Sequence, residues 1–392
     1  MSPVPDLSRA ERRYRLALGV GTLALLAASW PLWVGSADFP RIPFAPRVPV
    51  VAPIGVFAAL LGSVLGGAWR RWPMGVAAGL MIVEFLQDQQ RFQPWAYQYV
   101  MAAIALTCAP TARALGLCRL FTVALYFHSA LSKLDVSFAE GLAGAYLPGG
   151  WPSELGVPLA VSMSVGELLI ALGLILPRWR RVALWSAVIM HASLILILGI
   201  WLNHSLTVLI WNAAFLAQDL ILFGPGALAP PPATEAPSRL APLAGMAFLA
   251  AAILPLGERL GLVDPWPGFA FYAAHVDRVE VLIARGDLVR LPPGFPHRFV
   301  GGSVKDDDET AALDLTEWSR RARGVPIYPG ARAGLGLAEW LIGRYGLHGG
   351  VEVRSVGRAH PWTGERKVAV ARGLAEVRHL GDRFTLNAHP AP

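Results

Sequence analysis

The sequence is poor in three kinds of residue, and each shortage excludes a class of protein. Its 392 residues include two cysteines, Cys108 and Cys118, which are too few for a disulfide-stabilised scaffold. Charged residues make up 16% of the chain, against about 25% in soluble domains. Lysine is also scarce: of the 34 Lys+Arg residues, only Lys133, Lys305 and Lys367 are lysines. The composition therefore excludes a small disulfide-rich protein and an ordinary soluble domain.

Several catalytic signatures are missing as well. The sequence has no phosphate-binding glycine pattern, no zinc-ligand spacing and no Ser/His/Asp motif. The net charge of +7 lies largely in short loops between apolar runs, where membrane topology explains it. We therefore expect no nucleic-acid partner and no metal site.

Long hydrophobic runs are abundant. They recur from about residue 16 to 262 and predict about nine spans, at 16–34, 48–68, 72–87, 95–110, 116–134, 157–177, 182–201, 204–223 and 240–261. The predicted fold class is mainly α. It comprises a polytopic transmembrane helical bundle in residues 1–262 and a small extramembrane α+β domain in residues 263–392. In that domain we expect strands at 276–283, 352–356, 367–370 and 375–386, and a helix at 331–345 closed by Gly346.

Arginines are distributed unevenly between alternate loops. If the N-terminus is cytoplasmic, then Arg70-Arg71, Arg113 and the Arg178–Arg181 turn all lie in cytoplasmic loops. Nine spans then place the C-terminal domain outside. The predicted location is the bacterial cytoplasmic membrane, with lipid as one partner and an extracytoplasmic protein as a candidate partner of the C-terminal domain.

Lys133 ends the 116–134 run, where a lysine is costly unless it snorkels to the interface or serves a function. It is the only lysine in the apolar part of the chain. Because a desolvated lysine can lose its proton whereas arginine stays charged, this isolation favours a function. Helical spacing puts Tyr126, Ser129 or Ala130, and Lys133 on one stripe.

Other polar residues lie within apolar runs. Glu167 and His191 are near mid-membrane, where a carboxylate must be protonated, paired or hydrated. His128 is either a core histidine or a functional one, and Asn212 is often a helix–helix hydrogen-bond clamp. The catalytic candidates are Lys133, Glu167, His191 and His128, and Asn212 is a candidate ligand contact.

The segment 88–99 is a second polar cluster. Its amides and aromatic rings form either an aromatic belt with a polar turn or the wall of an outward-facing cavity. For the second interpretation the candidate cofactor-binding residues are Asp88, Arg91, Gln93, Trp95, Tyr97 and Tyr99.

These residues carry a family resemblance. Three segments resemble vitamin K-dependent γ-glutamyl carboxylases: Phe85-Leu86-Gln87-Asp88 with Tyr97-Gln98-Tyr99, Tyr126-Phe127-x-x-Ala130-x-x-Lys133-Leu134-Asp135, and the helix from Met190-His191. Residues 116–224 also resemble the four-helix unit of DoxX and MauE membrane proteins, through Lys133-Leu134, Gly166-Glu167-Leu168-Leu169 and the arginine-rich turn at 178–181. Both groups are similar to the wider HTTM membrane domain.

The resemblance implies that Lys133 is a base that deprotonates a reduced quinone, with a quinone or hydroquinone as cofactor or substrate. Trp95 stands where the carboxylases have a functional histidine, so γ-carboxylation itself is not implied. Two alternatives stay open: an accessory protein for redox chemistry or cofactor maturation without its own turnover, and a membrane scaffold whose outer domain binds a partner.

Overall fold

The computed structural model describes residues 7–36, 38–45, 53–65, 71–142, 152–224, 238–300, 309–347 and 350–391. Within these residues the chain is mainly helical and divides into two compact units. Unit 1 takes residues 1–28, 52–82 and 94–274, and unit 2 takes residues 29–51, 83–93 and 275–392. Unit 2 is thus assembled from three separate stretches of sequence, and the division falls within one helix, α4.

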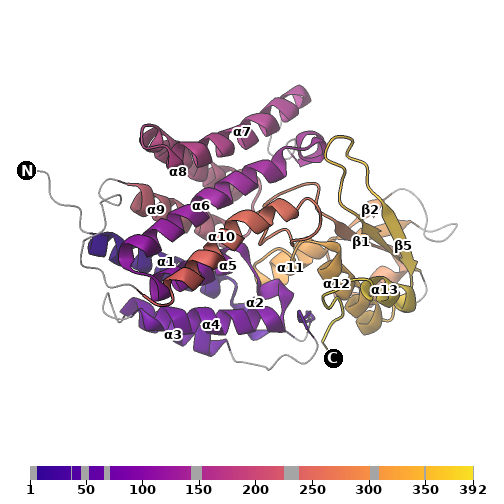
Figure 1. Ribbon diagram of the computed structural model, residues 1–392. Coiled ribbons are helices and arrows are strands. Elements are labelled where there is room, and N and C mark those ends of the chain that lie inside the picture. The colour runs from indigo at the N-terminus through magenta and orange to yellow at the C-terminus, as the bar shows by residue number, and fades with distance from the viewer. Residues whose placement is uncertain are drawn as a thin grey trace, which may run out of the picture. The chain divides into compact units, whose positions relative to one another are not determined.

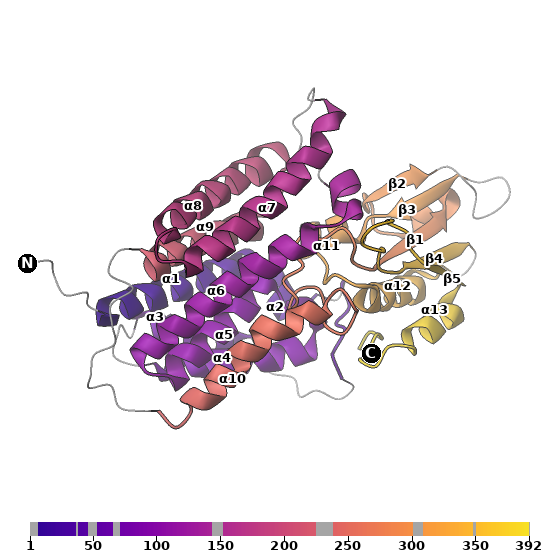
Figure 2. The same ribbon diagram turned by 45° about the horizontal axis from the view of Figure 1, so that its top comes forward.

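Unit 1 is built from helices (Figures 1 and 2). They are α1 (Leu7–Ala28), α3 (Ile54–Leu65), α4 (Trp72–Gln87), α5 (Pro94–Cys108), α6 (Thr111–Lys133), α7 (Gly156–Ile175), α8 (Arg180–Leu196), α9 (Leu206–Phe223) and α10 (Ala241–Ile253). Short helical turns join them: η3 (Phe138–Leu142), η5 (Ser153–Leu155), η6 (Ile197–Trp201) and η7 (Leu254–Gly257).

Four of the described helices are long and apolar enough to cross a membrane: α6, α7, α8 continued through η6, and α9. They are consecutive, and each packs against the next, side by side in both ribbon views (Figures 1 and 2). The nine predicted spans are not confirmed, because α3, α4 and α10 have only 12, 16 and 13 residues. Residues 48–52 and 66–68 of the second predicted span lie outside the described residues.

The outer faces of these helices suit a lipid environment. Leu169 on α7 is 62% exposed, Ile189 on α8 is 65% exposed and Ile200 in η6 is 72% exposed. Such a continuous apolar surface is rare on soluble proteins, and a helix satisfies its own backbone hydrogen bonds in hydrocarbon. Since the opposite faces of α7 and α8 bury Glu167 and His191, the polar groups of this bundle point inward.

Unit 2 contains a five-stranded antiparallel sheet in the order β2-β3-β1-β4-β5. The strands are β1 (Arg278–Ala284), β2 (His297–Val300), β3 (Thr310–Leu313), β4 (Val351–Val356) and β5 (Val368–Arg372). In the central register Val281 lies opposite Leu313 on one side and Val353 on the other. The helical elements are α2 (Trp30–Val34), η2 (Gln89–Arg91), η8 (Arg285–Arg290), α11 (Leu315–Arg323), α12 (Ala331–Tyr345) and α13 (Leu374–Gly381).

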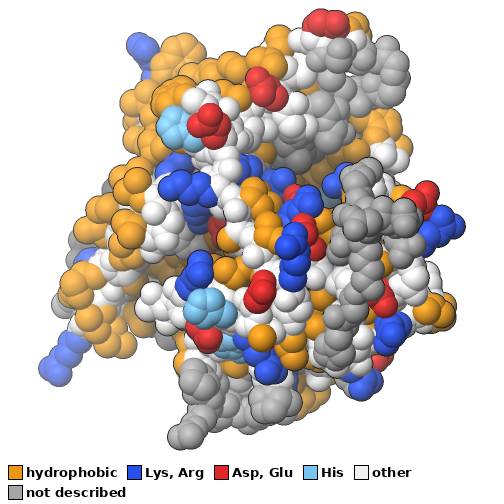
Figure 3. Space-filling model, turned by 90° about the vertical axis from the view of Figure 1, so that its right-hand side faces the viewer, with side chains coloured by type: hydrophobic (Ala, Val, Ile, Leu, Met, Phe, Trp, Pro, Cys, Tyr) orange, Lys and Arg blue, Asp and Glu red, His pale blue; other side chains and the backbone are white. Residues whose placement is uncertain are grey.

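The core of unit 2 draws on more than the C-terminal stretch. Phe39 and Ile42 are buried in the same cluster as Val281 and Leu341, and the Phe39 ring stacks on Trp318 with centroids 4.1 Å apart. On the face drawn in Figure 3, basic and acidic side chains are mixed with hydrophobic ones. Burial of apolar surface is the main term that stabilises a fold. The core of unit 2 therefore depends on residues that precede its sheet by more than 200 positions.

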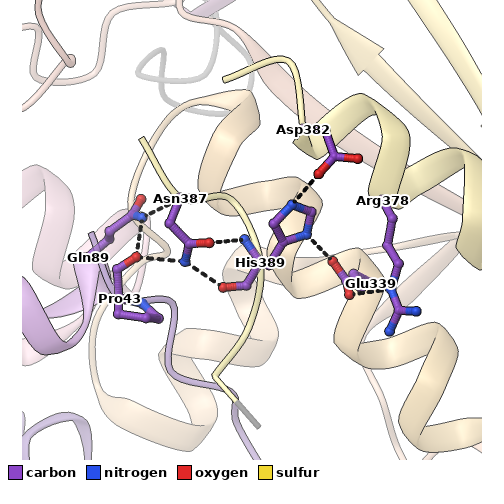
Figure 4. Close-up of polar contacts among 7 residues, drawn as sticks. All are labelled: Pro43, Gln89, Glu339, Arg378, Asp382, Asn387 and His389. Atoms are coloured by element: carbon purple, nitrogen blue, oxygen red, sulfur yellow. Dashed lines mark hydrogen bonds and ion pairs between the residues drawn. The ribbon is translucent and has the colours of Figure 1, made fainter. Parts of the chain in front are cut away.

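A hydrogen-bonded junction holds the last residues of the chain (Figure 4). Gln89 Nε2 donates to the carbonyl oxygens of Asn387 and Pro43 at 2.6 and 3.1 Å, and Asn387 Nδ2 donates to the Pro43 carbonyl at 2.8 Å. His389 lies between Glu339 Oε2 and Asp382 Oδ1, at 2.8 and 3.1 Å. This junction ties the C-terminal segment to both earlier stretches of unit 2.

The C-terminal secondary structure is partly as predicted. The helix Ala331–Tyr345, ended by Gly346 at φ 63°, is confirmed, and β1, β4 and β5 lie within two residues of their predicted positions. The strand pair predicted at 375–386 is wrong, because Leu374–Gly381 is a helix that buries Val377 and Leu380, three residues apart. The strands β2 and β3 were not predicted.

Candidate functional site

A small cavity lies within unit 1 among α6, α7, α8 and α9. Its volume is about 70 Å³. The residues with polar side-chain groups that line it include Tyr126, Ser129, Lys133, Glu167, His191 and Asn212, and the apolar ones include Leu125, Phe138, Met163, Met190, Phe215 and Phe271. We call it the central cavity. It has room for a few water molecules, whereas a cavity that binds benzene measures about 150 Å³.

Lys133 is fully engaged at one wall of the central cavity. Its Nζ donates to Glu167 Oε1 and Oε2 at 2.9 and 2.7 Å, and to Ser129 Oγ at 2.6 Å. Ser129 stands one helical turn before Lys133 on α6, which is the spacing that puts both side chains on the same face. Lys133 therefore does not snorkel, because its amine points inward to a carboxylate on α7.

The pair is buried on both sides, with side-chain exposures of 5% for Lys133 and 10% for Glu167. Removing two charges from water costs several kcal/mol per ion, and only close, hydrogen-bonded pairing offsets this. Three acceptor oxygens for one ammonium group meet that condition. The pair also allows a proton to pass from nitrogen to oxygen without leaving the site.

A second polar chain reaches the opposite wall. Tyr126 Oη lies 2.5 Å from Asp219 Oδ2 and 2.8 Å from His191 Nε2. His191 Nδ1 lies 2.8 Å from Asn212 Oδ1. These four side chains come from α6, α8 and α9 and connect the central cavity to a deeply buried carboxyl group.

A larger apolar groove runs along the outer side of α7 and α8. Its volume is about 840 Å³, and its lining includes Gly166, Ile170, Leu176, Ile189 and Ser186. We call it the lipid-facing groove. Met163, Glu167 and Met190 line both this groove and the central cavity. Glu167 therefore stands in the wall between the central cavity and the apolar outer surface of α7 and α8.

This geometry falls in the stretch where a known family matches. Residues 111–209 match the model of the family described as Methylamine utilisation protein MauE. The MauE segment, as we call these residues, comprises α6, α7, α8 with η6, and the start of α9. No curated protein and no solved structure matches the chain.

The MauE segment contains part of the site. It includes Tyr126, Lys133, Glu167 and His191 and ends before Asn212 and Asp219 on α9. Residues 111–209 are thus similar to MauE, and four of the described helices are long and apolar enough to cross a membrane. The comparisons give no match to the HTTM or carboxylase families.

Four candidates predicted in unit 1 lie away from the central cavity. His128 Nε2 is 2.8 Å from the carbonyl oxygen of Ala252 on α10, which is the arrangement of a core histidine. Trp95 is buried on α5, the Tyr97 ring meets Phe121 edge to face, and Tyr99 Oη lies 3.4 Å from the Met74 carbonyl. None of these side chains is among those that line the cavity in the described part of the chain.

Asp88, Arg91 and Gln93 belong to unit 2. Asp88 Oδ1 accepts hydrogen bonds from the backbone nitrogens of Gln90 and Ile42, and burial raises its pKa although Arg323 and Arg91 are nearby. Arg91 pairs with Glu84, and Gln93 Nε2 donates to the Gln90 carbonyl at 2.8 Å. These groups bind one another and the C-terminal stretch, so the polar cluster 88–93 has a structural role in unit 2.

Two members of this constellation are not among the candidates from the sequence. Tyr126 was assigned only to a helical stripe, and Asp219 was not singled out. The seven-residue spacing from Asn212 to Asp219 puts both on one face of α9, and that spacing was the available signal.

Proposed function

We propose that this MauE-type membrane protein binds a lipophilic, quinone-like molecule in the lipid-facing groove and exchanges a proton with it at the Lys133–Glu167 pair. The observation that carries this proposal is that Glu167 lines the groove and the central cavity while it pairs with Lys133. A quinone ring exceeds the 70 Å³ of the central cavity. The ring therefore occupies the groove, with an oxygen directed at Glu167.

Lys133 acts as the base through its partner. A covalent N–H bond of Lys133 breaks as an O–H bond forms on the Glu167 carboxyl group. This transfer leaves a neutral amine and a neutral acid. The hydroquinone O–H then breaks as an O–H forms on Glu167, which lines the groove, and the first carboxyl proton returns to Lys133 Nζ. The amine thus takes up a proton through Glu167, and the resulting ammonium stabilises the hydroquinone anion. The resemblance to the carboxylase segment around Lys133 supports this role, and Trp95 limits it to deprotonation without carboxylation.

Binding can be tested by the thermal stability of the purified protein with a short-chain quinone analogue. A ligand at 100 times its Kd stabilises the folded state by about 2.7 kcal/mol. Gly166→Leu should remove this stabilisation because the new side chain enters the groove, where no atom lies within 4 Å of a Cβ. Gly116→Leu is the matched control on the exposed face of α6, where a Cβ also meets nothing within 4 Å. Equal stabilisation of both variants would contradict binding in the groove.

The alternative function is an accessory protein for redox chemistry or cofactor maturation that has no turnover of its own. The match to a family named for methylamine utilisation favours this alternative. Direct dithiol–disulfide exchange is not supported, because Cys118 is buried and the two cysteines are not paired with each other. If Lys133→Arg folds, binds quinone and retains full cellular function, the accessory role is preferred over proton transfer at Lys133.

We also propose the bacterial cytoplasmic membrane as the location, with the Lys133 end of α6 and unit 2 on the extracytoplasmic side. The arginines in the loops before α6 and between α7 and α8 support this orientation. Unit 2 would then be available to an extracytoplasmic protein partner.

A further inference from the structure

Asp219, Tyr126, His191 and Asn212 form an unbroken hydrogen-bonded chain inside unit 1. Successive polar atoms are 2.5, 2.8 and 2.8 Å apart. The residues are 1%, 2%, 8% and 8% exposed, so bulk water does not compete for these bonds. The positions of the hydrogens along the chain can be worked out from its two ends.

The Asn212 end determines which nitrogen of His191 carries hydrogen. Asn212 Nδ2 donates to the Val208 carbonyl at 2.8 Å, which orients the amide. Its carbonyl oxygen Oδ1 therefore faces His191 Nδ1. An oxygen acceptor requires a donor opposite, so Nδ1 bears a hydrogen whether His191 is neutral or charged. Asn212 is thus a positioning residue for the imidazole.

At the Asp219 end, two arrangements of the hydrogens are possible. In the neutral one, Asp219 Oδ2–H donates to the Tyr126 oxygen and the Tyr126 hydroxyl donates to His191 Nε2. In the charged one, the Tyr126 hydroxyl donates to the Asp219 carboxylate and His191 Nε2–H donates to the Tyr126 oxygen. Asp219 Oδ1 is buried with no hydrogen-bond partner among the described residues. Since an ionised carboxylate with a bare buried oxygen is costly, the neutral arrangement is the resting one.

We propose that Asp219, Tyr126 and His191 form a proton relay that charges the wall of the central cavity. In one concerted step the Asp219 O–H breaks as an O–H forms on Tyr126, and the original Tyr126 O–H breaks as N–H forms on His191 Nε2. Asp219 becomes a carboxylate and His191 an imidazolium, and Tyr126 ends as it began. No oxidant or reductant takes part.

The relay responds to negative charge in the central cavity, because His191 lines that cavity together with Glu167 and Lys133. Among the described residues, Tyr14 of α1 is a further titratable group close to Asp219, and Cys118 of α6 forms a hydrogen bond with Tyr14. Neither lines the cavity, so His191 is the member that presents the transferred proton there. The relay needs no particular substrate and can be tested whether or not a quinone binds.

The first test reads the tautomer of His191 in the full chain, reconstituted in lipid nanodiscs and labelled with ¹⁵N-histidine. At neutral pH we expect a neutral ring with hydrogen on Nδ1, assigned by its loss in His191→Gln. A neutral ring with hydrogen on Nε2 and a bare Nδ1 would overturn the relay, because Nε2 could not then accept the proton.

The second test reads Asp219 by infrared spectroscopy. A band from a protonated, buried carboxylic acid should be present at neutral pH and absent in Asp219→Asn. Tyr126→Phe should shift this band by removing the acceptor oxygen, and the control Tyr99→Phe should not, because the Tyr99 hydroxyl bonds to the Met74 carbonyl instead. The relay would be refuted if Asp219→Asn lost only a carboxylate band. It would also be refuted if both tyrosine variants shifted the carboxylic acid band equally.

Discussion

Lys133 and Glu167 stabilise each other's charge in an apolar bundle, and this mutual dependence decides how single substitutions behave. The contacts at 2.7 and 2.9 Å join helices that are 34 residues apart in sequence at this point. A lone charge left in this position has neither water nor a partner. The same pair therefore determines both the stability and the chemistry of the central cavity.

We predict strong coupling between the two residues. Lys133→Met should lower the free energy of unfolding by about 3 to 5 kcal/mol, because Glu167 is left buried without its partner. Lys133→Met combined with Glu167→Leu should recover most of this loss, since the double variant contains no buried charge. Denaturant unfolding of the two single variants and the double variant measures the coupling, and additive effects would show that the pair is not joined.

A carboxylate of unit 2, Glu352, gives a pH-dependent prediction. Burial would raise the pKa of Glu352, but hydrogen bonds from Arg354 and Arg372 outweigh it and lower the pKa below its usual value. A lowered folded-state pKa stabilises the fold above the unfolded value of about 4.3, and this stability is lost as pH falls through the folded pKa. Both arginines are largely exposed, so the effect should be a few tenths of a kcal/mol. Glu352→Gln should flatten the loss of stability below about pH 4.3, and an unchanged acid profile would contradict it.

Single residues also show what the sequence could predict. Lys133, Glu167 and His191 were candidates because ionisable groups in apolar runs are costly and conspicuous, and the structure brings them to one cavity. Gln89 and Gln90 are also buried, and their side-chain oxygens accept hydrogen bonds from Arg332 and Arg323, more than 230 positions away. Nothing local in the sequence could identify such distant partners.

Among the elements, α12 shows how close packing limits its residues. A Cβ at Gly336 would lie 2.5 Å from the Ala388 carbonyl oxygen and 2.8 Å from Ile42 Cδ1. Real Cβ atoms do not approach a backbone oxygen so closely. The glycine therefore permits the contact between α12, the C-terminal segment and the stretch around Ile42.

We predict opposite effects for two glycines of α12. Gly336→Ala should destabilise unit 2 because the backbone of Ala388 must move. Gly343→Ala should stabilise it by about 0.5 to 1 kcal/mol, because that position is exposed with nothing within 4 Å and alanine favours the helix. Thermal unfolding of both variants tests this, and destabilisation by Gly343→Ala would show that helix propensity does not decide the result there.

The helices and strands were easier to predict than the way they group into the two units. Length and hydropathy predicted α6 to α9, because each is apolar over many residues, and helical periodicity predicted α12. The strand predicted at 375–386 failed because a short amphipathic helix and a short strand have similar composition. The short β2 and β3 carry too few residues for a periodic signal.

Across the whole chain, the structure departs most from the sequence-based prediction in the stretches of sequence that make up unit 2. A boundary near residue 263 separates apolar from polar sequence, whereas unit 2 also takes residues 29–51 and 83–93. Hydropathy reports where the chain can enter lipid, and it says nothing about which loops pack against a distant sheet.

The proposed orientation predicts different labelling at the two ends of α7. In a background without Cys108 and Cys118, Glu154→Cys should react with a membrane-impermeant maleimide in intact cells. Arg178→Cys should react only after the membrane is made permeable, because it lies in an arginine-rich cytoplasmic turn. Both positions are exposed, so accessibility within the protein does not limit either reaction. The reverse pattern would invert the topology.

The central claim is that the Lys133–Glu167 pair exchanges protons with a molecule in the lipid-facing groove. It is tested most directly by an infrared difference spectrum recorded on adding a short-chain hydroquinone to the reconstituted protein. We predict loss of a carboxylate band and gain of a protonated carboxyl band, both absent in Glu167→Gln. Binding of the hydroquinone without any change at a carboxyl group, or the same change in Glu167→Gln, would contradict the claim.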